Sequence, residues 1–241
     1  MDILETIIQH KVEDLTSRPR RSFKKALLEG SGVIAEFKRK SPSKGWIHQN
    51  ADPVAVAVKY EQGGASCMSV LTDEEFFGGS LDDLRAVRAA VGLPIIRKDF
   101  IISEIQIAEA ASYGADAVLL IAACLTVSRC SELAAFAHRL GLETLLEIHS
   151  EAELGHVGPN IDMVGVNNRN LGTFVTSVEN SFRLAACLPE GKVLVSESGI
   201  SNPETVRKLK DVGFRGFLIG ENFMKDNDPG EALASFVKEI C

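Results

Sequence analysis

The sequence predicts an α/β fold in the form of a (β/α)8 TIM barrel with an additional N-terminal helical extension. Short apolar runs rich in β-branched residues recur about every 26 residues, which is the length of one strand plus one helix. Helical patterns lie between these runs, and an unbroken strand–helix alternation implies parallel strands joined by crossovers. Eight such units within 241 residues match the size of a closed barrel.

An open, doubly wound sheet is the alternative architecture. Such sheets often carry a glycine-rich phosphate loop after the first strand. No GxGxxG follows the first strand here, and no GxxxxGK[ST] occurs anywhere in the sequence. The closed barrel is therefore favoured.

We expect a single barrel domain over residues 1–241, with the helical extension at 1–30 and the barrel at 31–241. Residues 2–16 place aliphatic side chains at helical spacing, which predicts an amphipathic helix before any strand. A second, short helix is expected at 22–28. Both would precede the regular alternation, which begins after Gly32.

The eight strands are expected where β-branched and apolar residues cluster, at 33–37, 66–71, 94–97, 117–121, 143–148, 163–166, 193–196 and 216–219. Helices are expected between and after them, at 53–61, 81–91, 104–113, 128–140, 151–157, 179–188, 203–212 and 231–240. Asp52, Ser80 and Asn202 precede helical patterns and are suited to N-caps. Gly114 and Gly213 follow helical patterns, where a glycine permits a left-handed cap.

Composition narrows the class of protein. The chain is 45% hydrophobic and 24% charged, with no apolar run long enough for a membrane span and no signal-peptide pattern, so we expect a cytoplasmic protein. The net charge of −7 argues against nucleic-acid binding, although a local basic patch can still bind an anionic small molecule. The five cysteines include no CxxC pair and the five histidines show no ligand spacing, so we expect no metal and no disulfide framework.

Polar residues gather at the carboxyl ends of the expected strands, where barrels of this kind carry their chemistry. Glu36 and Lys38 end the first strand and share one face. Lys98 ends the third strand, and Glu147 lies within the apolar end of the fifth. A buried carboxylate needs a partner or a chemical task, so Glu147 is either catalytic or part of a structural ion pair with a neighbouring lysine. We favour catalysis.

Two loops at the seventh and eighth strands suggest a phosphate site. Ser198-Gly199 and Gly220-Glu221 offer free backbone N–H groups, and these are the loops that often hold phosphate in this fold. Asn167 and Arg169 follow the sixth strand, and an arginine there suits a carboxylate or phosphate, although a helix-capping loop would also explain the segment.

Other polar residues receive simpler interpretations. We expect His149 to cap a helix or face solvent, and Arg39, Lys40 and Lys44 to form an electrostatic rim. The residues alone thus predict a barrel enzyme that acts on an anionic, phosphorylated metabolite by acid–base chemistry.

The segments AEFKRKSPSKG, LPIIRKDFI, LLEIHS, VGVNNRNL, VSESGI and LIGENFM resemble, in order, the motifs of the indole-3-glycerol phosphate synthase family. The resemblance covers essentially the whole chain. It implies ring closure of 1-(2-carboxyphenylamino)-1-deoxyribulose 5-phosphate to indole-3-glycerol phosphate in tryptophan biosynthesis, with loss of carbon dioxide and water. It also implies no cofactor.

The resemblance also implies roles for individual residues. Lys98 matches the general acid, and a lysine near other cations can have its pKa lowered toward a useful value. Lys38 matches the lysine that binds the substrate carboxylate and assists acid catalysis, and Glu147 matches the base of the dehydration. Glu36 and Asn167 match residues that orient these groups. The sequence leaves open which lysine or glutamate acts at which step.

The remaining matched positions concern binding. The residues implied to hold the phosphate are Ser41, Ser198, Gly199, Gly220 and Glu221. The last two would act through backbone N–H groups, because the Glu221 side chain would repel a phosphate. Glu197 and Arg169 would contact the substrate or fix its neighbours, and Phe100 would pack on the anthranilate ring.

Two other classes of function stay open. One is another phosphate-binding barrel of the same pathway, such as phosphoribosylanthranilate isomerase or the tryptophan synthase α subunit. The other is a non-catalytic barrel that binds a phosphorylated metabolite for regulation. In each case we expect a small-molecule partner, no nucleic acid, no membrane, and a monomer or at most a weak homodimer.

Overall fold

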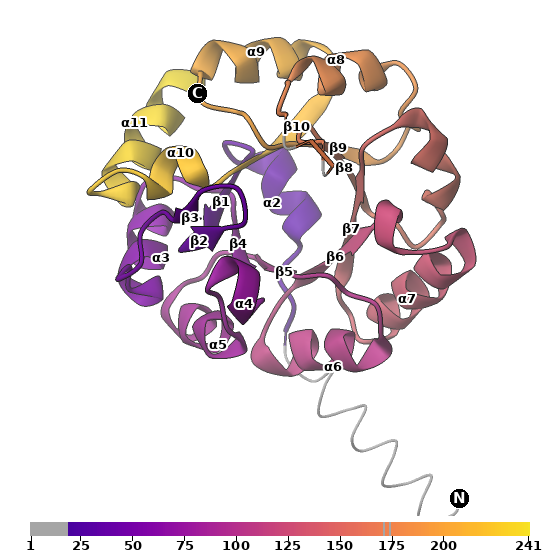
Figure 1. The fold of residues 1–241 in the computed structure, drawn as a ribbon, viewed down its shortest axis with the longest axis horizontal. Coiled ribbons are helices and arrows are strands. Elements are labelled where there is room, and N and C mark those ends of the chain that lie inside the picture. Colours follow the sequence, from indigo (N-terminus) through magenta and orange to yellow (C-terminus); the bar gives the residue numbers. More distant parts are fainter. Residues whose placement is uncertain (1–18, 171, 174) are drawn as a thin grey trace, which may run out of the picture.

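The computed structural model describes residues 19–241 except 171 and 174. Eight parallel strands form a closed barrel in the order β1-β10-β9-β8-β7-β6-β5-β4 (Figure 1). The barrel strands are β1 (Val33–Phe37), β4 (Cys67–Leu71), β5 (Ile95–Lys98), β6 (Ala117–Ile121), β7 (Glu143–Ile148), β8 (Met163–Asn167), β9 (Val193–Glu197) and β10 (Phe214–Ile219). Strand β1 pairs with β4 on one side and β10 on the other, which closes the sheet. The predicted barrel is confirmed, and the doubly wound alternative is wrong.

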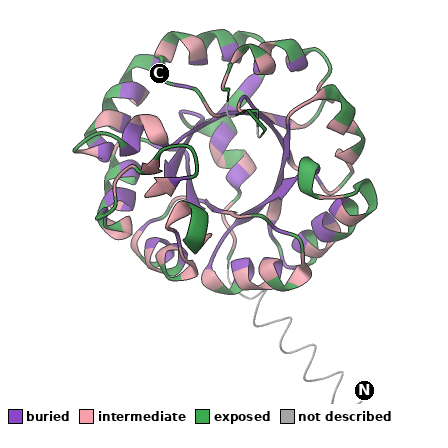
Figure 2. Ribbon diagram, viewed as in Figure 1, coloured by how far each residue is buried: buried purple, intermediate pink, exposed green. Residues whose placement is uncertain are grey.

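Helices surround the barrel and turn their buried faces toward it (Figure 2). The main ones are α3 (Pro53–Gln62), α5 (Leu81–Ala90), α6 (Glu104–Tyr113), α7 (Val127–Arg139), α8 (Glu179–Ala185), α9 (Pro203–Asp211) and α11 (Pro229–Ile240). The expected caps form, since the Asp52 side chain accepts from two backbone N–H groups of α3, and Gly114 ends α6 with a φ of 99°. The α-helix predicted at 151–157 is instead a 3-10 helix, η2 (Glu151–His156), because Gly155 and Gly158-Pro159 leave too little good helical sequence.

Several short elements follow the carboxyl ends of strands and were not predicted. They are the hairpin of β2 (Lys40–Ser41) and β3 (Gly45–Trp46), the helices α4 (Glu74–Phe77) and α10 (Glu221–Met224), and the 3-10 turn η1 (Ala122–Cys124). Segments of two to four residues are too short to show a helical or strand period. They build the rim of the barrel at the end where the polar residues gather.

Helix α2 (Phe23–Glu29) lies across the opposite end of the barrel (Figure 1). Its buried Phe23 and Leu27 belong to the same apolar cluster as Ile34, Met163 and other inward-facing strand residues. This helix, predicted at 22–28, therefore closes the amino-terminal end of the barrel. The helix predicted at 2–16 lies outside the described residues.

Candidate active site

A pocket of about 990 Å³ opens at the carboxyl ends of the strands. This volume is at the upper end of the usual range for small-molecule sites. The pocket brings together every residue that the sequence placed in a site: Glu36, Lys38, Ser41, Lys98, Phe100, Glu147, Asn167, Arg169, Glu197, Ser198, Gly199, Gly220 and Glu221. They converge because parallel strands of a closed barrel all end at the same rim.

At the floor of the pocket, Lys98 lies between two carboxylates. Its Nζ is 2.9 Å from Glu147 Oε2 and 3.1 Å from Glu197 Oε2. Both glutamates are buried, and the lysine side chain is only 13% exposed. The sequence did not show that Glu197 shares this lysine, because β5 and β9 are about a hundred residues apart in the chain.

Burial and the charges of this cluster raise the pKa values of Lys98 and Glu197 and lower that of Glu147. Burial acts to lower the pKa of Lys98, but the charges of Glu147, Glu197 and Glu36 outweigh it and raise that pKa above its ordinary value. The predicted lowering of the Lys98 pKa is therefore wrong, since its near neighbours are anions and not cations. Burial raises the pKa of Glu197 to about 7, reinforced by the negative charge of Glu147 and opposed by Lys98.

Glu147 keeps its charge more readily than Glu197. Burial acts to raise the pKa of Glu147, but Lys98 and a hydrogen bond from Asn167 outweigh it and hold that pKa below its usual range. Asn167 donates from Nδ2 to Glu147 Oε1 at 2.9 Å, and its own Oδ1 accepts from the Arg169 N–H. His149 Nε2 lies 3.4 Å from Glu147 Oε1, so the prediction of a capping or solvent-facing histidine is wrong.

The opposite wall carries a second ion pair. Lys38 Nζ lies 2.7 Å from Glu36 Oε1, and both side chains are largely buried. Ser69, the β4 residue paired with Glu36, donates to the other carboxylate oxygen at 3.4 Å. The predicted shared face of Glu36 and Lys38 is thus present, with one carboxylate for one lysine.

The loop after β9 lines the pocket and has an unusual backbone conformation. Ser198 has a φ of 69°, the one positive value for a non-glycine among the described residues, and Gly199 follows with a φ of 76°. Asn168 Nδ2 donates to the Ser198 carbonyl at 3.0 Å and to Ser196 Oγ at 3.0 Å, which holds this loop in place. Such strain is costly and is retained mainly at functional sites.

Cations line the same side of the pocket, on the loops after β1 and β8. Lys44 Nζ lies 2.6 Å from Glu221 Oε1, and Arg169 Nη2 lies 3.9 Å from Glu221 Oε2. Arg169 also donates to Ser43 Oγ at 3.0 Å. The Glu221 side chain is therefore bound to two cations in this structure. Lys44, which we expected only at the electrostatic rim, also lines the pocket.

Arg39, also expected at the rim, has a structural position instead. It makes two hydrogen bonds to the Asp83 carboxylate, at 2.6 and 3.1 Å, and donates to the carbonyls of Gly78 and Ala51. The arginine ties the loop after β1 to helix α5.

Aromatic and aliphatic side chains form the remaining wall. Phe100 is 43% exposed, and its ring centroid lies 6.3 Å from that of Phe77. Phe76, Leu119 and Ile121 also line the pocket. This apolar side could cover a flat ring opposite the polar loops.

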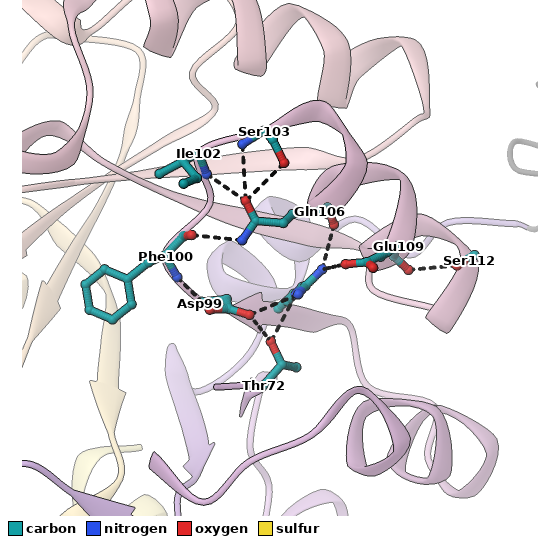
Figure 3. A network of polar contacts seen from close by, with 9 residues as sticks. Thr72, Asp99, Phe100, Ile102, Ser103, Gln106, Glu109 and Ser112 are labelled. Atoms are coloured by element: carbon teal, nitrogen blue, oxygen red, sulfur yellow. Dashed lines mark hydrogen bonds and ion pairs between the residues drawn. The ribbon is translucent and has the colours of Figure 1, made fainter. Parts of the chain in front are cut away.

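The loop that carries Phe100 is anchored by a network that the sequence did not reveal (Figure 3). Buried Arg97 points away from the barrel interior and donates to Thr72 Oγ1, to the Gln106 carbonyl, and to the carboxylates of Asp99 and Glu109. Asp99 in turn accepts from the Phe100 N–H at 2.8 Å. Because Lys98 and Phe100 flank Asp99, this network fixes the segment on which both lie.

Among the residues that the structure describes, no three His, Cys, Asp or Glu side chains are grouped to hold a metal ion, and no helix is long and apolar enough to cross a membrane. The fold and the pocket together are those of a (β/α)8-barrel enzyme, with a lysine and two carboxylates at the floor of the candidate site.

Comparison with known proteins names the family. The family model described as indole-3-glycerol phosphate synthase matches residues 4–236. Indole-3-glycerol phosphate synthases from Bacteroides thetaiotaomicron and Magnetococcus marinus are 62% and 44% identical, covering 91% and 98% of this chain and 85% and 98% of their own length. This chain belongs to the indole-3-glycerol phosphate synthase family.

Solved structures that resemble the chain share its fold at low identity. A mutant tryptophan synthase α-subunit from Pyrococcus furiosus superposes with a TM-score of 0.66 at 15% identity, covering 88% of this chain and 98% of its own. The 3-hexulose-6-phosphate synthase from Salmonella typhimurium gives 0.69 at 12% identity, covering 87% and 98%. These likenesses concern the barrel fold alone.

Proposed function

We propose that the pocket closes the indole ring of 1-(2-carboxyphenylamino)-1-deoxyribulose 5-phosphate, with loss of carbon dioxide and water, to give indole-3-glycerol phosphate. The observation that carries this proposal is the position of Lys98. This chain belongs to the synthase family, and the ammonium of its Lys98 lies between Glu147 and Glu197. The pocket above the lysine has glycine-containing loops on one side and an apolar wall on the other.

Lys98 acts as the general acid of ring closure. The ring carbon that bears the carboxylate attacks the ribulose carbonyl carbon, and negative charge develops on the carbonyl oxygen. The raised pKa keeps Lys98 in its proton-carrying form at neutral pH, so the proton is in place before the substrate binds. Loss of carbon dioxide then returns the electrons of the broken carbon–carbon bond to the ring.

Glu147 acts as the base of the dehydration. The departing hydroxyl must gain a proton and the substrate must lose one, so this step needs an acid and a base together. The lowered pKa leaves Glu147 ionised at neutral pH, and Asn167 orients its carboxylate. The nearby Lys98 and Lys38 are the two candidates for the acid, and Glu36 orients Lys38 through their 2.7 Å ion pair.

Lys38 also binds the substrate carboxylate, and Phe100 covers the anthranilate ring. The lysine lies on the wall opposite Glu147, and Phe100 lies on the exposed apolar rim. The anthranilate ring would therefore lie between the wall that carries Lys38 and the apolar wall that carries Phe100, with its reacting carbon above Lys98.

The substrate phosphate binds at the loops after β9 and β10. Ser198, Gly199, Gly220 and Glu221 supply backbone N–H groups, and buried Ser41 supplies a hydroxyl with no other hydrogen-bond partner among the described residues. Glu221 holds Lys44 and Arg169 in the free protein, and the phosphate replaces its carboxylate as their partner. The expected repulsion by Glu221 is thus reduced because two cations lie beside it.

The test supplies purified protein with the carboxyphenylamino-deoxyribulose phosphate and follows the fluorescence of the indole product. We expect steady turnover. A folded protein that binds the substrate without forming indole would instead support a non-catalytic binding barrel. Formation of this same substrate from phosphoribosylanthranilate, or release of indole from indole-3-glycerol phosphate, would support one of the other two pathway enzymes.

A further inference from the structure

A glycine in the middle of β8 lies directly against the cluster formed by Lys98, Glu147 and Glu197. Gly165 shares the inward face of β8 with Asn167, and it pairs in register with Glu147 on β7 and Val195 on β9. A β-carbon placed at Gly165 would lie 2.1 Å from Glu197 Oε1 and 3.2 Å from Glu197 Cδ. The Glu197 carboxylate therefore occupies the volume that any other side chain at this position would fill.

The backbone itself does not require this glycine. Gly165 is not one of the glycines with a positive φ, so an alanine could adopt its conformation. A glycine inside a strand weakens that strand and often marks a close approach by another group. The close approach here is made by the Glu197 carboxylate.

The position of Glu197 Oε1 depends on packing. Oε1 is buried and has no hydrogen-bond partner among the described residues, whereas Oε2 is bound to Lys98 at 3.1 Å. No hydrogen bond to Oε1 would resist displacement by a methyl group. Because Gly165 has no β-carbon, the Glu197 carboxylate can lie against the backbone of β8. In this position its other oxygen, Oε2, contacts Lys98.

We propose that Gly165 is a positioning residue for the reaction: its missing side chain creates the slot in which Glu197 is held against Lys98. The expected effect of Gly165 on kcat rests on the proposed function. The expected clash between a side chain at this position and Glu197 rests on the geometry alone. Groups that face Glu197 from the neighbouring elements are Lys98 on β5, Glu147 on β7 and Glu36 on β1. Displacing Glu197 changes the charge balance around Lys98, which carries the reacting proton.

The kinetic test compares Gly165→Ala with Gly216→Ala. Gly216 is a buried glycine in β10, and the atoms nearest to a β-carbon there belong to the aliphatic side chains of Val195 and Leu27, at 2.8 and 3.2 Å. We expect Gly165→Ala to lower kcat at least tenfold with KM changed less than threefold, and Gly216→Ala to keep kcat within twofold. Turnover of folded Gly165→Ala within twofold of the parent would overturn the proposal.

The pH profile gives a readout that a general loss of stability would not move. Burial is the largest influence on the Glu197 pKa and raises it more than the charge of Lys98 lowers it. A carboxylate pushed toward the open pocket regains water, and we expect this to outweigh any loss of contact with Lys98, so that its pKa falls. We expect the ionisation in kcat/KM that belongs to Glu197 to move toward lower pH by at least half a unit in Gly165→Ala, and not in Gly216→Ala. If the Glu197 ionisation in the kcat/KM profile stays at the same pH in Gly165→Ala, the proposal that Gly165 positions Glu197 would be contradicted.

A stability arm needs no activity at all. Adding Gly165→Ala to the parent should lower Tm by several degrees, whereas adding it to Glu197→Ala should lower Tm far less, because the clashing carboxylate is gone. An equal loss of Tm in both backgrounds would overturn the proposal. If Gly165→Ala alone does not fold, a folded Gly165→Ala/Glu197→Ala double variant supports the slot and an unfolded one refutes it. A parent without synthase activity would refute the proposed function and leave this arm intact.

Discussion

The two ends of the barrel both contain buried charges, but the charges are satisfied in different ways. At the amino-terminal end, Asp116 and Arg88 form a pair in which the two side chains are almost fully buried, 2.9 Å apart. Asp116 also accepts backbone N–H groups of Arg21 and Ile95, at 3.0 Å each, and Arg88 donates to the carbonyls of Leu93 and Val91. This network has one cation for one anion, and each carboxylate oxygen accepts a hydrogen bond.

At the carboxyl-terminal end the balance is unequal. Lys98 faces two carboxylates, with Glu36 as a third negative charge nearby, and Glu197 Oε1 lacks a hydrogen-bond partner in the described part of the chain. Buried ion pairs that are fully hydrogen-bonded serve folding, and groups with displaced pKa values in a cleft are candidates for catalysis. The difference teaches that the balance of charges and hydrogen-bond partners, and not burial, separates the structural Asp116–Arg88 pair from the Lys98 cluster that we propose to be reactive.

The largest expected effect is a loss of kcat when the Lys98 cluster at the carboxyl-terminal end is altered. Replacing Lys98→Met removes the proposed acid, and we expect kcat to fall by roughly 10³-fold, within the range for loss of a general acid. The measurement is steady-state indole formation by protein whose folding is checked by circular dichroism. Turnover within tenfold of the parent would remove Lys98 from this role.

The matching change at the structural end should affect folding instead. Asp116→Asn leaves Arg88 without its counter-charge, and we expect the free energy of unfolding to fall by about 3 kcal/mol. Denaturant titration measures the loss, and kcat of the folded variant should stay within about twofold. A loss of kcat without a loss of stability would contradict the division between the two ends.

A third prediction concerns pH. The pKa of Glu197 is raised from 4.5 to about 7, so the folded state binds a proton that the unfolded state releases between these values. The stability contributed by this proton is present below pH 4.5 and is lost as pH rises through about 7. Glu147, with a lowered pKa, has the opposite sign, and its stability is lost as pH falls below its usual range.

We therefore expect Glu197→Gln to lose roughly 2 kcal/mol less stability than the parent between pH 5 and 7.5. Urea titrations across this window measure the slope. The control is Glu204→Gln, an exposed glutamate that pairs with Lys208 away from the pocket, and this variant should keep the slope of the parent. Equal slopes in the parent and Glu197→Gln would show that Glu197 does not titrate there.

The smallest effect concerns the edge of the pocket. Glu221→Gln removes the carboxylate that competes for Lys44 and Arg169, and we expect the inhibition constant of inorganic phosphate to fall about threefold, or roughly 0.6 kcal/mol. Glu204→Gln is the control, because Glu204 also lies in a first helical turn and pairs with a lysine, at 3.0 Å, away from the pocket. Weaker phosphate inhibition in Glu221→Gln would mean that Glu221 supports the site and does not compete with it.

The sequence predicted the barrel and the membership of the pocket well, because both follow from regular patterns. Strand and helix periods give the order of elements, and residues at strand ends must meet at the rim. It could not predict which charges meet. The Lys98–Glu197 contact and the buried Arg97 network depend on contacts between different elements, which have no local pattern in the chain. The proximity of His149 to Glu147 is different, because the two residues are two positions apart and strand alternation could have placed them on one face.

The most direct test of the central claim is a crystal structure with indole-3-glycerol phosphate bound. We expect the phosphate on the loops at Gly199 and Gly220, and the indole ring against the Phe100 wall. Lys98 Nζ should lie within about 4 Å of the newly formed ring and still contact Glu147. A product bound with its ring away from Lys98, while the lysine keeps both glutamates as partners, would contradict the assignment of the reactive end.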